Sequence, residues 1–228
     1  MTINTEDLLN SILESLERME YIKPSDIPNI DLYMDQVTTF MDSRLRAGAR
    51  NPGEDKILTK TMINNYAKND LLPPPVKKKY TKEHVLLLIF IYYYKGILSI
   101  GDIQTLLGPI TERFFQSEDS FTLEDVYREA FGMEADQIQA LKADVTEKFR
   151  VAEDTFQNAP EESREFLRKF AFICTLGFDV YVKRLLIEKL VDELAAESHK
   201  EKEEKKKEQK GEKAQGDKVR GQAVKEEE

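Results

Sequence analysis

The feature that most constrains the fold is an uninterrupted apolar run from Val85 to Tyr94. Its ten residues are about half of the roughly 20 that a helix needs to cross a bilayer, and Glu83, His84 and Lys95 flank it. A helix that is apolar on every side must be enclosed by other helices. The run therefore predicts a buried helix at the centre of a predominantly all-α fold, and we expect no membrane association.

The length and the cysteine content set broader limits. A chain of 228 residues can form one ordinary domain with tails or two small domains. Its single cysteine, Cys174, excludes an internal disulfide and favours a reducing compartment. The first residues, MTINTEDLLN, carry acids where a secretory signal carries basic residues. We therefore expect a cytoplasmic protein, with Cys174 as a small core residue.

The charge distribution points to one basic segment in an acidic protein. The net charge is -9, yet residues 56–84 carry seven lysines against only Asp70 and Glu83, a local +5. Residues 1–55 sum to -6 and residues 118–196 to -8. A focused basic patch is what local phosphate contact requires, while acidic surroundings limit indiscriminate binding. Considered as charge alone, the lysines also fit a solvated surface loop.

Amphipathic spacing and capping residues predict helices along most of the chain. The predicted helices cover residues 5–20, about 30–45, 59–69, 81–94, 99–107, from 122 onward, 133–156 and 160–194. The stretch RAGARNPGEDK, residues 46–56, has no apolar stripe and reads as a loop. Arg44, Arg46 and Arg50 in or beside it are either additional phosphate contacts or, as is more common for loop arginines, simply solvated.

The helix that Thr59 is expected to cap has a distinctive outer face. Met62, Ile63 and Tyr66 can point to the core, and no acid occurs between Thr59 and Asn69. Asparagine can both donate to and accept from an adenine edge, while lysine and threonine reach phosphates or guanine. This face is a candidate for DNA contact, and a polar solvent face is an equally good interpretation of the helix alone. Its outward residues are Lys60, Thr61, Asn64, Asn65 and Lys68.

Three consecutive prolines, residues 73–75, follow this helix and fix three backbone φ angles. We expect a stiff, extended segment that projects Lys77, Lys78 and Lys79 as a basic arm towards phosphates. A proline-rich docking ligand is the competing interpretation, although prolines between two helices are poorly placed for capture. Tyr80 then returns the chain to the body, and Thr81 caps the apolar helix.

These motifs together resemble the N-terminal domain of MerR-type transcription regulators, a winged helix-turn-helix. The resemblance lies in the helix segment 63–66, the Leu-Leu-Pro-Pro turn at 71–74, the basic wing at 77–80, the cap Thr81, and SIGDIQTLL at 99–107 as the fourth helix.

The chain also departs from the MerR pattern. Asn64 and Asn65 stand where the MerR pattern has arginine and tyrosine, so phosphate clamping at these positions is not implied. Asp70 replaces the usual glycine, at a position where aspartate tolerates a left-handed backbone. The loop at 46–56 is longer than a compact helix-turn-helix uses, so either the first helix is displaced or the loop itself makes contacts.

The chain also resembles, over about residues 5–180, an uncharacterised bacterial family that carries a domain-of-unknown-function label and is related to MerR. This second resemblance implies no established activity. The expected fold is predominantly all-α, with a MerR-like winged helix-turn-helix that the resemblance implies. The apolar residues after position 120 add a C-terminal helical bundle, and the segment from residue 196, which is too polar to bury a core, adds a disordered charged tail. The expected organisation is an N-terminal helix (1–29), the winged module (30–110), a C-terminal helical region (111–195) and the tail (196–228).

Two functional hypotheses follow. The first is a DNA-binding transcription regulator that contacts double-stranded DNA through Lys60, Thr61, Asn64, Asn65, Lys68, Lys77, Lys78 and Lys79. The alternative is a helical protein-interaction module that keeps the helix-turn-helix shape without binding DNA. Residues 166–187 are too apolar for a two-per-heptad coiled coil, so we expect a bundle, with room for a homodimer interface in the C-terminal helices.

Nothing in the sequence points to catalysis. His84 and His199 are the only histidines, and no Cys/His cluster has the spacing of metal ligands. We therefore expect neither an enzyme nor a cofactor or metal site.

Overall fold

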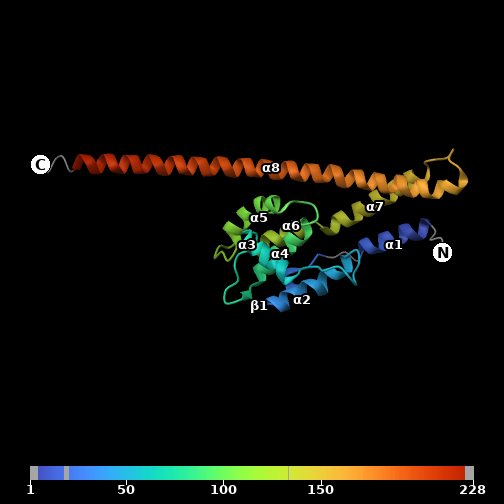
Figure 1. Ribbon diagram of the computed structural model, residues 1–228, viewed down its shortest axis with the longest axis horizontal. Helices are drawn as coiled ribbons and strands as arrows, with labels where there is room; N and C mark the ends of the chain where they lie inside the picture. Colours follow the sequence, from blue (N-terminus) through green and yellow to red (C-terminus); the bar gives the residue numbers. More distant parts are fainter. Residues whose placement is uncertain (1–4, 18–20, 133, 224–228) are drawn as a thin grey trace. The chain divides into compact units, whose positions relative to one another are not determined.

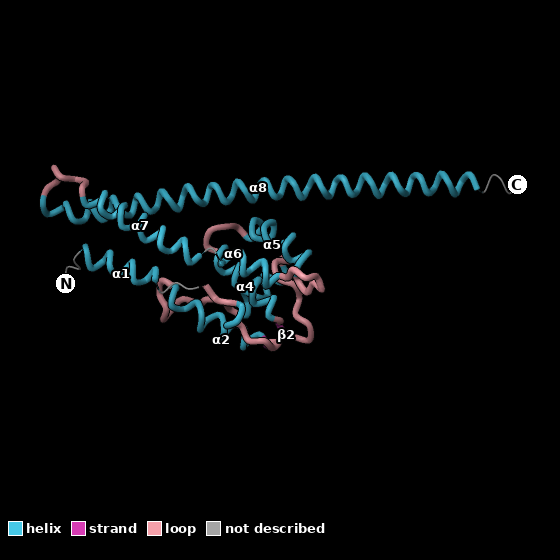
Figure 2. The backbone as a smooth tube through the Cα atoms, turned by 180° about the vertical axis from the view of Figure 1, so that it is seen from behind, coloured by secondary structure: helices cyan, strands magenta, loops and turns pink. Residues whose placement is uncertain are grey.

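The computed structural model describes residues 5–17, 21–132 and 134–223, and it is predominantly helical (Figures 1 and 2). The chain divides into two compact units, residues 1–185 and 186–228. The boundary falls inside the last helix, α8 (Glu161–Ala223). None of the helices in the described ranges combines the length and the apolar character that a bilayer-spanning segment requires.

Helix α4 (Lys82–Tyr94) is the centre of the first unit (Figure 1). Residues 85–91 are seven consecutive apolar side chains, none more than 5% exposed. Full burial of one such side chain contributes about 1.5–3 kcal/mol, so this helix is a major source of the unit's stability. Helices α5 (Ile100–Phe114) and α6 (Leu123–Gly132) both pack against it. The buried helix expected from the apolar run is thus confirmed.

A two-stranded antiparallel sheet stands beside α4. Strand β1 (Leu32–Tyr33) pairs with β2 (Lys79–Tyr80), so that Leu32 faces Tyr80 and Tyr33 faces Lys79. The sequence predicted a helix from about residue 30, but α2 (Met34–Leu45) begins only after β1. Tyr33 is extended, with φ -76° and ψ 159°, and its N–H donates to Gln36 Oε1 at 2.8 Å, so the helix starts there. Helix α3 (Lys60–Lys68) follows a loop, giving the order β1, α2, α3, β2, α4, α5.

The segment before β1 is fastened to α6 by a long-range hydrogen bond. The hydroxyl of Tyr127, which is fully buried, donates to the carbonyl of Ile22 at 2.7 Å. The Tyr127 ring also lies against those of Phe90 and Phe131, with centroids 5.3 and 4.6 Å apart. A buried tyrosine needs a partner for its hydroxyl, and here that partner holds the short helix η1 (Pro24–Asp26) and its neighbours against the core.

A separate apolar cluster joins α1 (Thr5–Glu17), α7 (Glu134–Glu153) and the first turns of α8 (Figures 1 and 2). Its buried members are Val145, Phe149, Ala152 and Phe172, with Leu9, Ile12, Leu13, Ala171 and Leu176 packed against them. Lys148 of α7 forms ion pairs with Asp179 of α8 and with Asp144. The predicted N-terminal helix therefore packs with the C-terminal helical region.

Helix α8 departs from the sequence-based expectations in two ways. Cys174 is exposed and is not the core residue we expected, because Phe172 and Leu176 occupy the side of α8 that faces α7. The backbone is helical as far as Ala223, whereas a disordered tail was expected from residue 196; residues 224–228 lie outside the described part. Glutamates and lysines recur four residues apart there, as at Glu203 and Lys207, a spacing that favours a helix without burial.

Candidate nucleic-acid interface

Helix α3 separates its apolar and polar residues by side. Thr59 caps it as expected, with its Oγ1 accepting from the Met62 N–H at 3.1 Å. Ile63 and Tyr66 are buried, at 0% and 6% exposure, and Met62 is half-buried. The five outward residues of the predicted contact face are all exposed: Lys60, Thr61, Asn64, Asn65 and Lys68.

The end of α3 is a two-hydrogen-bond cap built around Asp70. The Leu71 N–H donates to the Tyr66 carbonyl at 2.9 Å, and the Asp70 N–H to the Ala67 carbonyl at 3.3 Å. This hydrogen-bond pattern needs a left-handed residue directly after the C-cap residue Asn69, and Asp70, at that position, has φ 53°. The left-handed conformation considered for Asp70 from the sequence is therefore present, and it turns the buried Leu71 and Leu72 back into the core.

The three lysines of the predicted arm lie on a tight hairpin instead of an extended segment. Lys77 and Lys78 both have positive φ, 51° and 64°, and the Lys79 N–H donates to the Val76 carbonyl at 3.0 Å. Two central residues with positive φ define a type I′ turn, whose twist matches paired strands. Lys77 and Lys78 are exposed at its tip.

Lys79 differs from the other two lysines because it is part of the sheet. It is half-buried, it pairs with Tyr33, and its Nζ lies 5.6 Å from the centroid of the Tyr33 ring. A cation over an aromatic face is held electrostatically. Lys79 is therefore less available to a phosphate than Lys77 and Lys78.

The start of α2 brings α3 and the hairpin together. Asp35, in the first turn of α2, forms an ion pair with Lys60 at the start of α3. Tyr33, two residues earlier, contacts Lys79 of β2. The exposed face of α3 and the lysine hairpin are thus joined through the β1–α2 junction. One of the predicted contact residues, Lys60, is already paired with the Asp35 carboxylate.

His84 packs against Tyr80, the residue that ends the hairpin strand β2. It is fully buried, its Nδ1 accepts from the Thr81 N–H at 3.0 Å, and its ring lies edge-on to Tyr80 and Phe115, with centroids 5.4 and 4.8 Å away. Burial lowers the pKa of His84, against a smaller opposing effect of the backbone carbonyls of Pro73 and Pro74. Burial therefore favours the neutral form of His84, whose ring packs against Tyr80 and Phe115.

The long loop before α3 is fastened to the fold at both ends. Arg46 donates from Nε to Asp42 Oδ2 at 2.8 Å and also bonds the Pro52 carbonyl. Lys95 at the end of α4 donates to the Ile57 carbonyl at 2.8 Å and lies 4.4 Å from the centroid of the Tyr92 ring. Of the loop arginines considered as phosphate contacts, Arg46 is thus engaged within the protein, while Arg50 is exposed.

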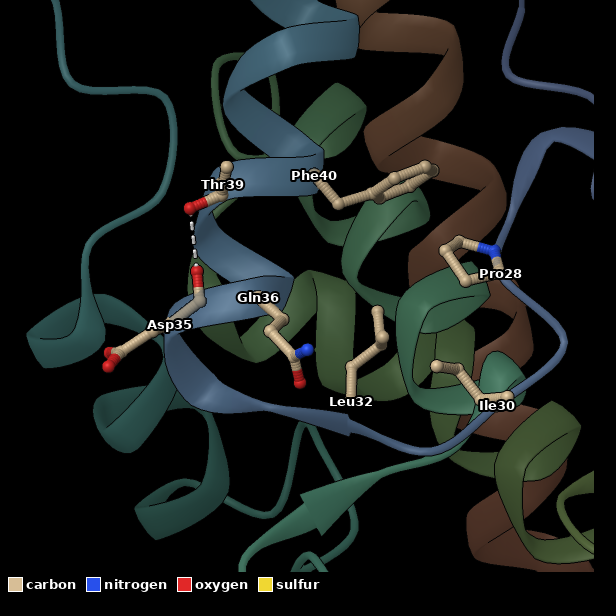
Figure 3. Close-up of a pocket in the computed structure, with 7 residues that line it drawn as sticks. All are labelled: Pro28, Ile30, Leu32, Asp35, Gln36, Thr39 and Phe40. Carbon is tan, nitrogen blue, oxygen red and sulfur yellow. Dashed lines mark hydrogen bonds between the residues drawn. The ribbon is translucent and has the colours of Figure 1, made fainter.

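A shallow apolar groove lies beside the same junction, between α2 and the segment that leads into β1 (Figure 3). Its volume is about 450 Å³, and Ile30 on its rim is 66% exposed. Sequence reasoning missed this groove because Ile30 was assigned to the apolar stripe of a helix that was expected to begin near residue 30. The groove is lined by Pro28, Ile30, Leu32, Asp35, Gln36, Thr39 and Phe40. Over the described ranges, no group of three or more His, Cys, Asp or Glu side chains is placed to hold a metal ion.

Comparison with known proteins gives one family match and no function. Residues 22–130, which hold the sheet and helices α2 to α6, match the family model described as Domain of unknown function (DUF1836). The match to an uncharacterised domain family agrees with the second resemblance in the sequence. No curated protein and no solved structure matches the chain.

Proposed function

We propose that residues 30–110 form a winged helix-turn-helix of the MerR type that binds double-stranded DNA and regulates transcription. Helix α3 would enter the major groove, and the hairpin at Val76–Lys79 would lie on the flanking phosphates as the wing. An α-helix about 10–12 Å across matches a major groove about 12 Å wide.

The proposal rests on one observation: β1 and the start of α2 connect two exposed polar elements, the outer face of α3 and the lysine hairpin. The outer face of α3 has no acid, and the hairpin tip presents Lys77 and Lys78. The order of recognition helix, basic hairpin, capped helix and fourth helix is also the order that the MerR resemblance implies, and the structure has helices and a hairpin in these places. Asn64 and Asn65 would contact base edges, Thr61 and Lys68 the groove walls, and the hairpin lysines the backbone.

Two features favour the alternative, a protein-interaction module without DNA contact. The groove beside α2 exposes apolar surface around Ile30. The Asp35 carboxylate holds Lys60 and adds negative charge next to the proposed interface. Both features would suit a partner protein that docks on α2.

An unbiased selection of DNA fragments bound by the full chain at low salt separates the two. The DNA-binding proposal predicts enrichment of a recurring sequence. A bound pool without any enriched sequence would contradict a sequence-specific regulator and favour the interaction module.

A further inference from the structure

One acidic residue, Asp35, reaches the otherwise acid-free side of α3. It lies in the first turn of α2, and its carboxylate forms an ion pair with Lys60, the first residue of α3. Both side chains are largely exposed, 74% for Asp35 and 60% for Lys60. Figure 3 shows that the Asp35 side chain points away from Ile30 and Phe40 of the apolar groove. The carboxylate therefore serves the α3 side of α2 and not the groove.

Lys60 is placed to reach DNA when α3 is fully seated. In a helix-turn-helix the second helix lies in the major groove with its N-terminal residues at base edges, while the first helix crosses the backbone. Lys60 directly follows the cap Thr59, so a seated α3 would bring its ammonium group to the DNA. A looser, sequence-independent complex depends on phosphate contacts alone. The exposed Lys77 and Lys78 at the hairpin tip can make those contacts without Lys60.

The ion pair between Asp35 and Lys60 can be exchanged for a DNA contact because it is exposed. Exposed lysine–carboxylate pairs contribute little to stability, and the fold does not enclose either side chain. A carboxylate in direct contact with Lys60 still competes well with a phosphate that is farther away. Among the proposed contact residues, Lys60 is the one that a carboxylate holds in the described part of the chain.

The carboxylate of Asp35 can be removed without disturbing the start of α2. The hydroxyls of Thr38 and Thr39 donate to the backbone carbonyl of Asp35, at 2.9 and 2.8 Å, so these bonds do not depend on its side chain. The unpaired N–H groups at a helix start also attract anions. Asp35→Asn therefore frees Lys60 and removes a charge that opposes phosphate at this end of α2.

We propose that Asp35 is a selectivity gate for the DNA interface. It holds Lys60 back from phosphates in sequence-independent complexes and releases it when α3 is seated in the major groove. This inference rests on the proposed DNA-binding function and adds to that site a residue that limits non-specific binding. Asp35 acts through Lys60 and is a positioning residue.

The affinity of the full chain for a random-sequence duplex, measured across salt concentrations, tests the gate. Asp35→Asn should raise this affinity about tenfold at about 0.1 M salt and steepen the slope of log K against log salt by about one, since one lysine is freed for one phosphate. Asp26→Asn is the matched control, because Asp26 is an exposed acid on η1 and its substitution changes the net charge equally. The control should keep the wild-type slope.

A double-substitution cycle separates the gate from a general effect of charge. In the wild type Asp35 already holds the lysine, so Lys60→Gln should change the random-duplex affinity by less than about threefold. In the Asp35→Asn background the same substitution should remove the tenfold gain, about one phosphate contact. A Lys60→Gln effect of equal size in both backgrounds would overturn the gate.

The gate also predicts a change in sequence preference. A duplex recovered by selection already engages Lys60 in the wild type, so Asp35→Asn should raise its affinity less than that of the random duplex. The ratio of the two affinities should therefore fall, by up to about tenfold. An equal gain on both duplexes would show that seating α3 does not release Lys60.

Failure of the gate and failure of DNA binding give different results. If the wild type binds DNA and the substitutions at positions 35 and 60 act additively, the gate alone is overturned. If neither the wild type nor Asp35→Asn binds any duplex at low salt, the proposed function is overturned and the gate with it.

Discussion

At the scale of single residues, His84 is a buried titratable group that packs against Tyr80 at the base of the hairpin. Its imidazole is enclosed by Tyr80, Phe115 and the proline segment, and burial lowers its pKa. The charged group from another segment that acts on it is Asp31, whose effect on the pKa is small and opposite. The neutral form of His84 is therefore the one that fits the folded state.

This pKa shift predicts a pH dependence of stability. In the unfolded chain His84 takes up a proton below about pH 6.5, and in the folded state it does so only at lower pH. Between these two values the unfolded state binds more protons, so the free energy of unfolding falls as the pH falls, by up to about 1.4 kcal/mol per pH unit. Above about pH 6.5 this contribution is fully present.

Urea unfolding of the wild type and of His84→Asn at pH 7.5 and pH 5.5 measures the effect. Asparagine keeps an acceptor for the Thr81 N–H but does not titrate, so its loss of stability on acidification should be smaller than that of the wild type. Equal losses in His84→Asn and wild type would show that another group dominates.

Sequence reasoning succeeded for single residues wherever the local chain decides the outcome. Thr59, Thr81 and Asp70 adopt the expected capping or left-handed roles because a cap depends on four or five neighbouring residues. Cys174 was misplaced because helical periodicity does not say which of two apolar sides of a helix is covered.

At the scale of elements, α3 is the proposed reader of base edges. The side chains of Asn64 and Asn65 are exposed near the middle of the helix. Asn65 Oδ1 also accepts a hydrogen bond from Nδ2 of the C-cap residue Asn69 at 3.3 Å. Replacing both by alanine should reduce the preference for a selected sequence over random DNA, by about 1–3 kcal/mol for each bidentate hydrogen-bonded pair that the substitution removes. Binding to random DNA should change little, because phosphate contacts supply most of that affinity.

Competition binding with selected and random duplexes measures this preference. Gln104→Ala, an exposed amide on α5, is the matched control and should leave the preference intact. If Asn64 and Asn65 can both be removed without any change in preference, α3 does not read the sequence.

The hairpin and the strand β1 are the two elements that the sequence did not predict. Three prolines predicted a stiff arm, but the turn depends on positive φ at two lysines, which have no side-chain preference for it. The strand Leu32–Tyr33 is only two residues long and forms because β2 is available 47 positions later. Such pairing cannot be recognised from periodicity. The candidate site residues on α3, by contrast, could be assigned to the exposed side from periodicity alone.

At the scale of the whole molecule, the central question is whether a chain of net charge -9 binds DNA through one basic segment. The acidic remainder repels DNA at long range, so binding must depend on short-range contacts that salt screens.

The hairpin allows its charge to be removed while its shape is kept. The double substitution Lys77→Asn and Lys78→Gly introduces the pair that type I′ turns prefer, so the hairpin should persist without its two exposed lysines. Lys205→Asn with Lys206→Gly in the tail is the matched control, since it changes the net charge equally.

The most direct measurement is the affinity of the full chain for a random-sequence duplex across a range of salt concentrations. We predict that the affinity falls with salt and that the double substitution at 77 and 78 flattens the slope of log K against log salt by up to about two. The tail control should keep the wild-type slope. Absence of binding at low salt, or a slope that the hairpin substitution leaves unchanged, would contradict the proposed DNA interface.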